Sequence, residues 1–223
     1  MRAVRGVIIA LAVASMTTGI GLTILGGRTL RWAPPPQPPR SAALGAGQLG
    51  LGPRASPRPA RPGRRYLPRP MARSRPLALS IPAIGVRARI ISLGLAADGA
   101  PRVPPLATPF VTSWYDPGPA PGQRGTAIVF GHVDSAAVGP AVFYNLGRLR
   151  RGDLIEVLLA DRHTALFRVY AAELYQKASF PRAIYSYTQW PTLRLITCGG
   201  AFDRHTRSYL GNTVVFAEYV GQG

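Results

Sequence analysis

The chain has 223 residues and a formal net charge of +18, since 27 basic side chains outnumber 9 acidic ones. This length suggests one domain, or at most two. Residues 1–76 carry 13 of the basic side chains and no acidic ones, so the basicity is concentrated near the N-terminus. Neither interleaved aromatic residues nor a recognition-helix pattern accompanies this charge. Nucleic acid is therefore excluded as the expected partner, and anionic lipids or wall polymers are favoured.

An uncharged, largely apolar segment occupies residues 6–27. As a helix it would be about 33 Å long, enough to cross the core of a bilayer. Arg2 and Arg5 precede it, as expected of a cytoplasmic N-terminus. We therefore predict a cytoplasmic N-terminus at 1–5 and a transmembrane anchor at 6–27. A cleaved secretory signal, suggested by Ala12-Val13-Ala14, is the alternative, and both interpretations export the rest of the chain.

Residues 28–76 are rich in proline and arginine, with 12 of the 23 prolines between positions 33 and 76. Acidic residues are absent and apolar side chains are sparse. Such a composition does not bury enough surface to offset the entropy of the chain. We predict a flexible spacer of polyproline character that holds the following domain away from the membrane.

Residues 77–223 form the expected folded domain, and they are rich in β-strand signals. Apolar runs bounded by turn residues occur at 88–93, 126–130, 154–159 and 165–171, and the last two flank a hairpin turn at 160–164. Prolines between positions 101 and 121 mark long loops. One short helix is expected near 140–146. A mostly-β fold, a small closed or nearly closed barrel, fits this pattern.

Cys198, the only cysteine, follows Leu195-Ile196-Thr197, which is typical of the end of a buried strand, and precedes two glycines. His132 likewise follows an apolar run, 127–130, after one glycine. A thiol becomes a nucleophile as its thiolate, which needs a nearby base or cation at neutral pH. A lone cysteine with a histidine elsewhere is thus a candidate nucleophile, although a buried structural thiol is the alternative. We predict that Cys198 and His132 act together at two strand ends.

With these two motifs, the sequence resembles the sortases, and within them it is most similar to the class E/F group of actinobacterial type. The resemblance covers roughly residues 77–220. It rests on five ordered segments: LSIPAIGV (79–86), WY followed by GPAPG (114–122), FGHVDS (130–135), LRLITCGGAFD (193–203) and YLGNTVVFA (209–217). It implies an eight-stranded sortase-type β-barrel with one or two short helices, preceded by the N-terminal transmembrane helix.

The resemblance also implies a third catalytic group, an arginine near the start of the last strand. Where many relatives have that arginine this chain has Leu210, so Arg207 is our candidate and Arg204 is the second choice. A guanidinium can stabilise the oxyanion that forms when a thiolate attacks an amide. Backbone N–H groups at 199–200 are an alternative source of donors. Thr197 and Gly199, which flank Cys198, are predicted to contact the substrate.

Other polar side chains compete for a place in the site. His163 lies in the predicted hairpin turn, and His205 lies in a polar loop after Cys198. Asp134 follows His132 by two residues, and it either orients the imidazole or holds the loop. The sequence contains no Cys/His cluster and no acidic calcium loop, so we expect neither a metal nor an organic cofactor.

By resemblance, the chain is a membrane-anchored cysteine transpeptidase. It would cleave the Thr–Gly bond of an LPxTG-like sorting signal and transfer the acyl group to an amine of the cell-wall precursor. Its expected partners are proteins with C-terminal sorting signals, that amine and the cytoplasmic membrane, with the catalytic domain extracellular. The alternatives are a catalytically silent barrel that binds peptide or wall polymer, and a cysteine peptidase that mainly hydrolyses.

Overall fold

The computed structural model describes residues 33–39 and 68–223 of the chain. The predicted anchor at 6–27 lies outside the described residues, as does most of the predicted spacer. Within the two described ranges, no helix is both long enough and apolar enough to cross a membrane.

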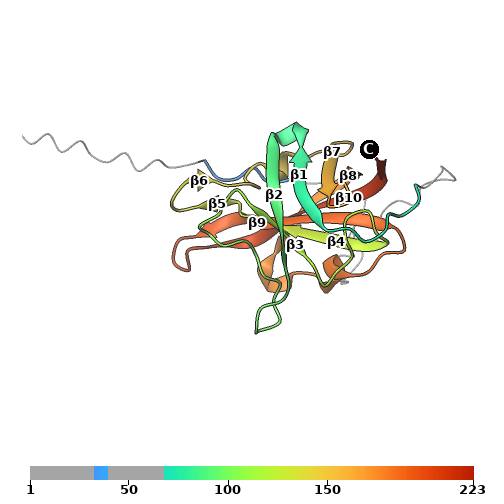
Figure 1. Ribbon diagram of the computed structural model, residues 1–223. Coiled ribbons are helices and arrows are strands. Elements are labelled where there is room, and N and C mark those ends of the chain that lie inside the picture. Colours follow the sequence, from blue (N-terminus) through green and yellow to red (C-terminus); the bar gives the residue numbers. More distant parts are fainter. Residues whose placement is uncertain (1–32, 40–67) are drawn as a thin grey trace, which may run out of the picture. The chain divides into compact units, whose positions relative to one another are not determined.

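The domain is a closed eight-stranded barrel, as the sequence predicted (Figure 1). Around the barrel the strands follow the order β1-β2-β3-β4-β9-β10-β8-β7, and β5 and β6 form a separate two-stranded sheet. The strands are β1 (Pro76–Ile81), β2 (Val86–Leu93), β3 (Thr112–Tyr115), β4 (Gly125–Phe130), β5 (Asp134–Ser135), β6 (Gly139–Pro140), β7 (Leu154–Leu159), β8 (Thr164–Gln176), β9 (Pro191–Asp203) and β10 (Ser208–Gln222).

The helices of the described part are short 3-10 turns rather than α-helices. They are η1 (Pro82–Ile84), η2 (Leu146–Arg148), η3 (Lys177–Ser179) and η4 (Arg182–Tyr185). The helix expected near 140–146 is thus replaced by a turn that leads into η2. Each turn has only three or four residues, because prolines and strand ends interrupt any longer helical pattern.

Two apolar clusters follow from the two-residue alternation of the strands. One fills the barrel and includes Leu193 and Leu195 of β9, both fully buried. The other covers the outer face of β4, β9 and β10, where Ile196 and Phe216 pack against Ile184 of η4. The loop between β8 and β9 therefore closes over this outer face and leaves the end of β9 beyond it.

Two stretches of the predicted spacer lie against the barrel. Before β1, the Met71 amide donates to the Gly122 carbonyl (2.8 Å), and the Arg73 guanidinium lies 5.0 Å from the centroid of the Trp114 ring. The other stretch, residues 33–39, contains two buried prolines, Pro35 and Pro38. Proline-rich segments lose little conformational entropy when they dock, so their sparse apolar surface suffices.

Candidate active site

The parallel pairing of β4 with β9 brings the histidine and the cysteine to the same edge of the sheet. The last register pair is Phe130 with Ile196, and the Gly131 amide donates to the Ile196 carbonyl (3.2 Å). His132 and Cys198 each follow this pair by two residues. Neighbouring strands lie about 4.8 Å apart, so the two residues leave the sheet as neighbours.

Cys198 faces outward, on the side of the barrel covered by η4. The contacts of the two preceding pairs of the β9–β10 ladder establish this orientation. Arg194 lies over the ring of its partner Phe216 at 5.5 Å, and Ile196 shares the outer apolar cluster with its partner Val214. The next alternate pair is Cys198 with Asn212, and both side chains are partly exposed.

His132 is held from three directions. The Phe143 ring packs over Gly131, where a Cβ would lie 2.6 Å from the ring, so the preceding residue must be glycine. The Phe143 amide donates to the His132 carbonyl (2.9 Å). Nε2 of His132 donates to the buried carbonyl of Pro104 at 2.7 Å, because a carbonyl only accepts. A proton is therefore on Nε2, and Nδ1 is the nitrogen that remains to exchange a proton with a substrate.

Asp134 holds the loop rather than the imidazole. Its carboxylate accepts a hydrogen bond from the Tyr209 hydroxyl at the start of β10. Burial raises the pKa of Tyr209, and the hydrogen bond to Asp134 raises it further, with smaller contributions from nearby Tyr144 and Cys198. Tyr209 therefore stays neutral at physiological pH and ties the histidine loop to the strand beside Cys198.

This arrangement matches a known family. A model of the sortase domain matches residues 79–220, which include every strand of the barrel except parts of the first and last. The chain belongs to the sortase family. Sortases are cysteine transpeptidases, and this chain is an enzyme of that kind.

Solved sortases share the fold. Sortase A from Listeria monocytogenes gives a TM-score of 0.51 at 12% identity, over 68% of this chain and 90% of that one. The lid mutant of sortase A from Corynebacterium diphtheriae gives 0.50 at 18% identity, over 67% and 72%. Sortase C-3 from Streptococcus pneumoniae gives 0.50 at 18% identity, over 65% and 62%. At these identities the likeness establishes the fold alone. A search of curated proteins finds no match.

In this sortase, Arg207 lies in a turn beyond the part of β10 that pairs with Cys198. Arg204 and Arg207 lie in the exposed turn that joins β9 to β10, and Arg207 has a left-handed backbone with φ of +52°. Arg207 comes five positions before Asn212, the partner of Cys198. At about 3.4 Å per residue of strand, five positions correspond to at most about 17 Å of extended chain. The register therefore favours a donor nearer to Cys198 than Arg207, and the role of Arg207 stays a prediction.

The two predicted substrate contacts are buried beside Cys198. Thr197 is 4% exposed and alternates with Cys198, so its side chain faces the interior of the barrel. Its hydroxyl has no hydrogen-bond partner within the described part of the chain. Gly199 packs against the Thr213 side chain, where a Cβ would not fit. Contact with a substrate through the Thr197 side chain would therefore require it to leave the barrel interior.

The remaining histidines lie away from the site. His163 is exposed in the turn between β7 and β8, where its ring lies 3.5 Å from Asp161. His205 is exposed in the β9–β10 turn, where its amide donates to Asp203 at 2.8 Å. Of the three histidines, His132 alone stands at the strand end beside Cys198.

Sequence reasoning missed two groups that the tertiary structure places at the site. Asn212 is the cross-strand neighbour of Cys198, and no described residue is hydrogen-bonded to its side chain. The Pro104 carbonyl, 28 residues before His132, fixes the tautomer of the imidazole. The β9–β10 hairpin register would have indicated Asn212, but no local pattern signals the approach of Pro104.

A buried arginine fixes the loop between β8 and β9, which covers the outer face of β4, β9 and β10. Arg194 of β9 is 3% exposed, and its guanidinium donates to the Ile184 carbonyl of η4. Burial lowers the pKa of Arg194, whereas its neighbour Tyr170 has a pKa raised to about 12, chiefly by burial. Arg194 precedes Cys198 by four positions, and its guanidinium donates to carbonyls of η4 and is hydrogen-bonded to Tyr170. The role of Arg194 is therefore to hold the loop between β8 and β9 in place and not to contact the Cys198 thiol.

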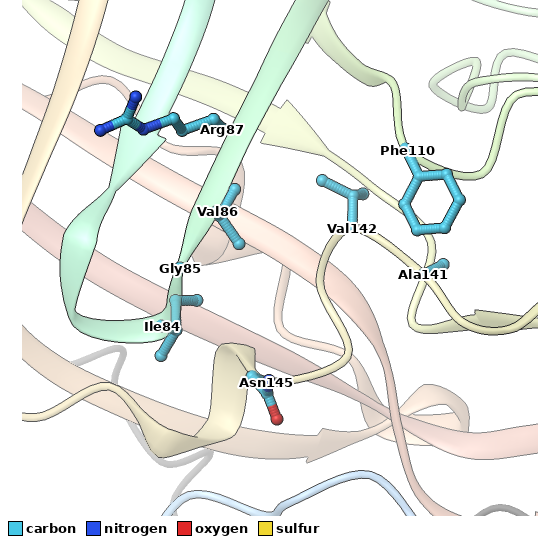
Figure 2. Close-up of a pocket in the computed structure, with 8 residues that line it drawn as sticks. All are labelled: Ile84, Gly85, Val86, Arg87, Phe110, Ala141, Val142 and Asn145. Atoms are coloured by element: carbon cyan, nitrogen blue, oxygen red, sulfur yellow. The ribbon is translucent and has the colours of Figure 1, made fainter.

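A cavity of about 230 Å³ lies between the start of β2 and the segment 141–145 (Figure 2). Its lining contains one charged side chain and no cysteine, histidine or carboxylate, so it does not contain the reactive groups. One lining residue, Val142, directly precedes Phe143, whose amide donates to the His132 carbonyl. The lining residues are Ile84, Gly85, Val86, Arg87, Phe110, Ala141, Val142 and Asn145. Within the described ranges, no group of three or more His, Cys, Asp or Glu side chains could hold a metal.

Proposed function

We propose that this sortase cleaves an LPxTG-like sorting signal through a thioacyl-enzyme on Cys198 and transfers the protein to a cell-wall amine. The observation that carries the proposal is the parallel β4–β9 pairing, because His132 and Cys198 each follow its last register pair by two residues. Family membership supports the reaction class. The sequence resemblance supports a class E/F type of enzyme, and the apolar segment at 6–27 supports a membrane-anchored, extracellular location.

In the first half-reaction, the Cys198 thiolate attacks the carbonyl carbon of the Thr–Gly bond and forms a C–S bond. The C–N bond then breaks, and protonated His132 gives its proton to the leaving amine nitrogen. The threonyl group remains on sulfur as a thioester. In the second half-reaction, an entering amine attacks the thioester, His132 takes the amine proton, and the thiolate leaves. Two substrates and a covalent intermediate predict ping-pong kinetics.

The tetrahedral intermediates carry an oxyanion that needs fixed donors. The sequence proposed Arg207 for this role, and the assignment stays a prediction. The geometry favours Asn212, because directly opposed residues of an antiparallel pair have Cβ atoms about 4.5–5.5 Å apart. We propose that the Asn212 amide N–H donates to the oxyanion that develops beside Cys198. Neutral side-chain amides serve this purpose in other acyl-transfer enzymes.

Cys198→Ala tests the function. The variant should bind a fluorescent sorting peptide but form no thioacyl-enzyme by intact-protein mass spectrometry and transfer nothing to an added amine. His132→Ala should react with the peptide much more slowly while it retains the barrel, as judged by circular dichroism. Peptide transfer by the Cys198→Ala variant would refute the proposal. If the natural chain cleaves the peptide but forms no transfer product with added amines, the enzyme is instead a hydrolase.

A further inference from the structure

The segment Ala33–Pro39, here called the proline strap, lies against the active-site end of the barrel (blue in Figure 1). Its Ala33 carbonyl accepts a hydrogen bond from the Tyr144 hydroxyl. The side-chain oxygen of Gln37 accepts a hydrogen bond from the Gly200 amide at 3.0 Å. The side-chain nitrogen of Gln37, Nε2, donates to the Pro35 carbonyl at 2.8 Å, which fixes the rotamer of Gln37.

The Gly200 amide is available because the β9–β10 ladder has a bulge at this point. Gly199 pairs with Gly211, but the next pair is Phe202 with Tyr209, so β9 carries one extra residue. Gly200 adopts a φ of +82°, which glycine reaches without strain. An unpaired N–H thus stands two residues beyond the nucleophile, and the strap occupies it.

A second glycine makes room for the strap. A Cβ at Gly147 of η2 would collide with the Pro36 carbonyl, and the three atoms nearest to that position all belong to the strap. Gly147 is not among the described residues of positive φ, so its backbone does not require glycine. The absent side chain therefore serves the contact with the strap. Figure 2 shows the strap as the blue segment that passes below the turn of η2.

Proline suits this contact. Its fixed φ pre-organises an extended polyproline II segment without internal hydrogen bonds, so its carbonyls remain free to accept from a docking surface. An extended segment whose carbonyl and amide oxygens accept from fixed donors is also the form in which a sorting peptide would approach Cys198.

We propose that Tyr144, Gly147 and Gly200 form a binding surface for a polyproline segment and that residues 33–39 of this chain are its ligand. Docked there, the strap competes with the sorting peptide at the Cys198 end of the barrel. The competition rests on the proposed function, whereas the docking does not. In this proposal, residues 33–39 act as an intramolecular ligand of the domain that follows them.

The single cysteine provides a readout that does not depend on transpeptidation. The rate at which a bulky maleimide alkylates Cys198 is measured in the full chain. Gln37→Ala removes one hydrogen bond of the strap and should accelerate alkylation about 3–10-fold. Gly147→Ala excludes the strap sterically and should accelerate alkylation at least as much. Gly94→Ala is the matched control, because its Cβ meets nothing closer than 3.6 Å, and should leave the rate unchanged.

A synthetic peptide of residues 33–39 distinguishes docking from a general loosening of the fold. Added to the Gln37→Ala chain, it should slow alkylation toward the natural rate. Added to the Gly147→Ala chain, it should have no effect. Equal alkylation rates in the natural chain and both variants would overturn the proposal, and so would equal protection of both variants by the peptide.

Acylation by a sorting peptide then tests the competition. While the strap occupies the site, only the strap-free fraction of the enzyme binds the sorting peptide, so the apparent affinity is lower by that fraction. In Gly147→Ala, KM should therefore fall by the same factor by which the alkylation rate rises, and kcat should be unchanged. Faster alkylation without a lower KM would refute the competition and leave the docking surface intact. If alkylation is faster in the variants but neither they nor the natural chain are acylated by the sorting peptide, the proposed function is refuted and the docking surface is not.

Discussion

Asn212→Ala is expected to slow acylation of Cys198 by about 10²–10³, the usual effect of losing one oxyanion donor. The side chain is the nearest amide on the outward face of β10, and it is the cross-strand partner of the nucleophile. Arg207→Ala should have little effect on the rate, because the arginine lies in the hairpin turn, five positions before the cross-strand partner of Cys198. The two substitutions therefore separate the geometric assignment from the one made by resemblance.

The assay is single-turnover formation of the thioacyl-enzyme with a sorting peptide, followed by mass spectrometry. Alkylation of Cys198 by iodoacetamide is measured in parallel, so that a change in the reactivity or exposure of the thiol is separated from the loss of an oxyanion donor. Leu210→Ala, an exposed neighbour on the same strand, is the matched control. Asn212→Asp keeps the shape of the side chain, removes the donor and adds a charge, so it should be slower still.

Wild-type acylation in Asn212→Ala would refute this reasoning. A large loss in Arg207→Ala in the same experiment would return the role to the arginine and require the hairpin to fold back over the site. Normal rates in both variants would assign the oxyanion to backbone donors, of which the Gly200 amide is the candidate once Gln37 leaves it.

Three further predictions concern stability. Tyr209→Phe should lower the free energy of unfolding by about 1.5–3 kcal/mol in urea titrations, because the hydrogen bond to Asp134 is lost. Since the pKa of Tyr209 is raised in the folded state, its contribution is complete below pH 10 and is lost at higher pH, so the variant should show a smaller alkaline loss of stability. Arg194→Ala should destabilise the fold by about 2–4 kcal/mol through a cavity and an unpaired Ile184 carbonyl, and wild-type stability would contradict its role in holding the loop between β8 and β9. Arg73→Ala should lower Tm by about 2–5 °C by removing a cation–π contact and two hydrogen bonds to carbonyls, and an unchanged Tm would mean that this part of the spacer is not docked in solution.

Local patterns determined which residues form strands and where the reactive groups occur along the chain. The run 154–159 is β7 as predicted, and the turn at 160–164 closes the expected hairpin with β8. The alternation of apolar side chains also determines that Thr197 and Cys198 face opposite sides of β9. These features depend on neighbours within a few residues, which the sequence shows directly.

Only the tertiary structure decided which distant groups meet. The parallel register of β4 with β9, the Pro104 carbonyl on His132 and the strap on Gly200 each join residues far apart in the sequence. Their partners are selected by the closure of the whole barrel, because a backbone donor or acceptor is chemically the same at almost every position. The register of β9 with β10 extends this hairpin past Cys198, so the cross-strand partner of the nucleophile is Asn212 and Arg207 lies in the turn beyond it.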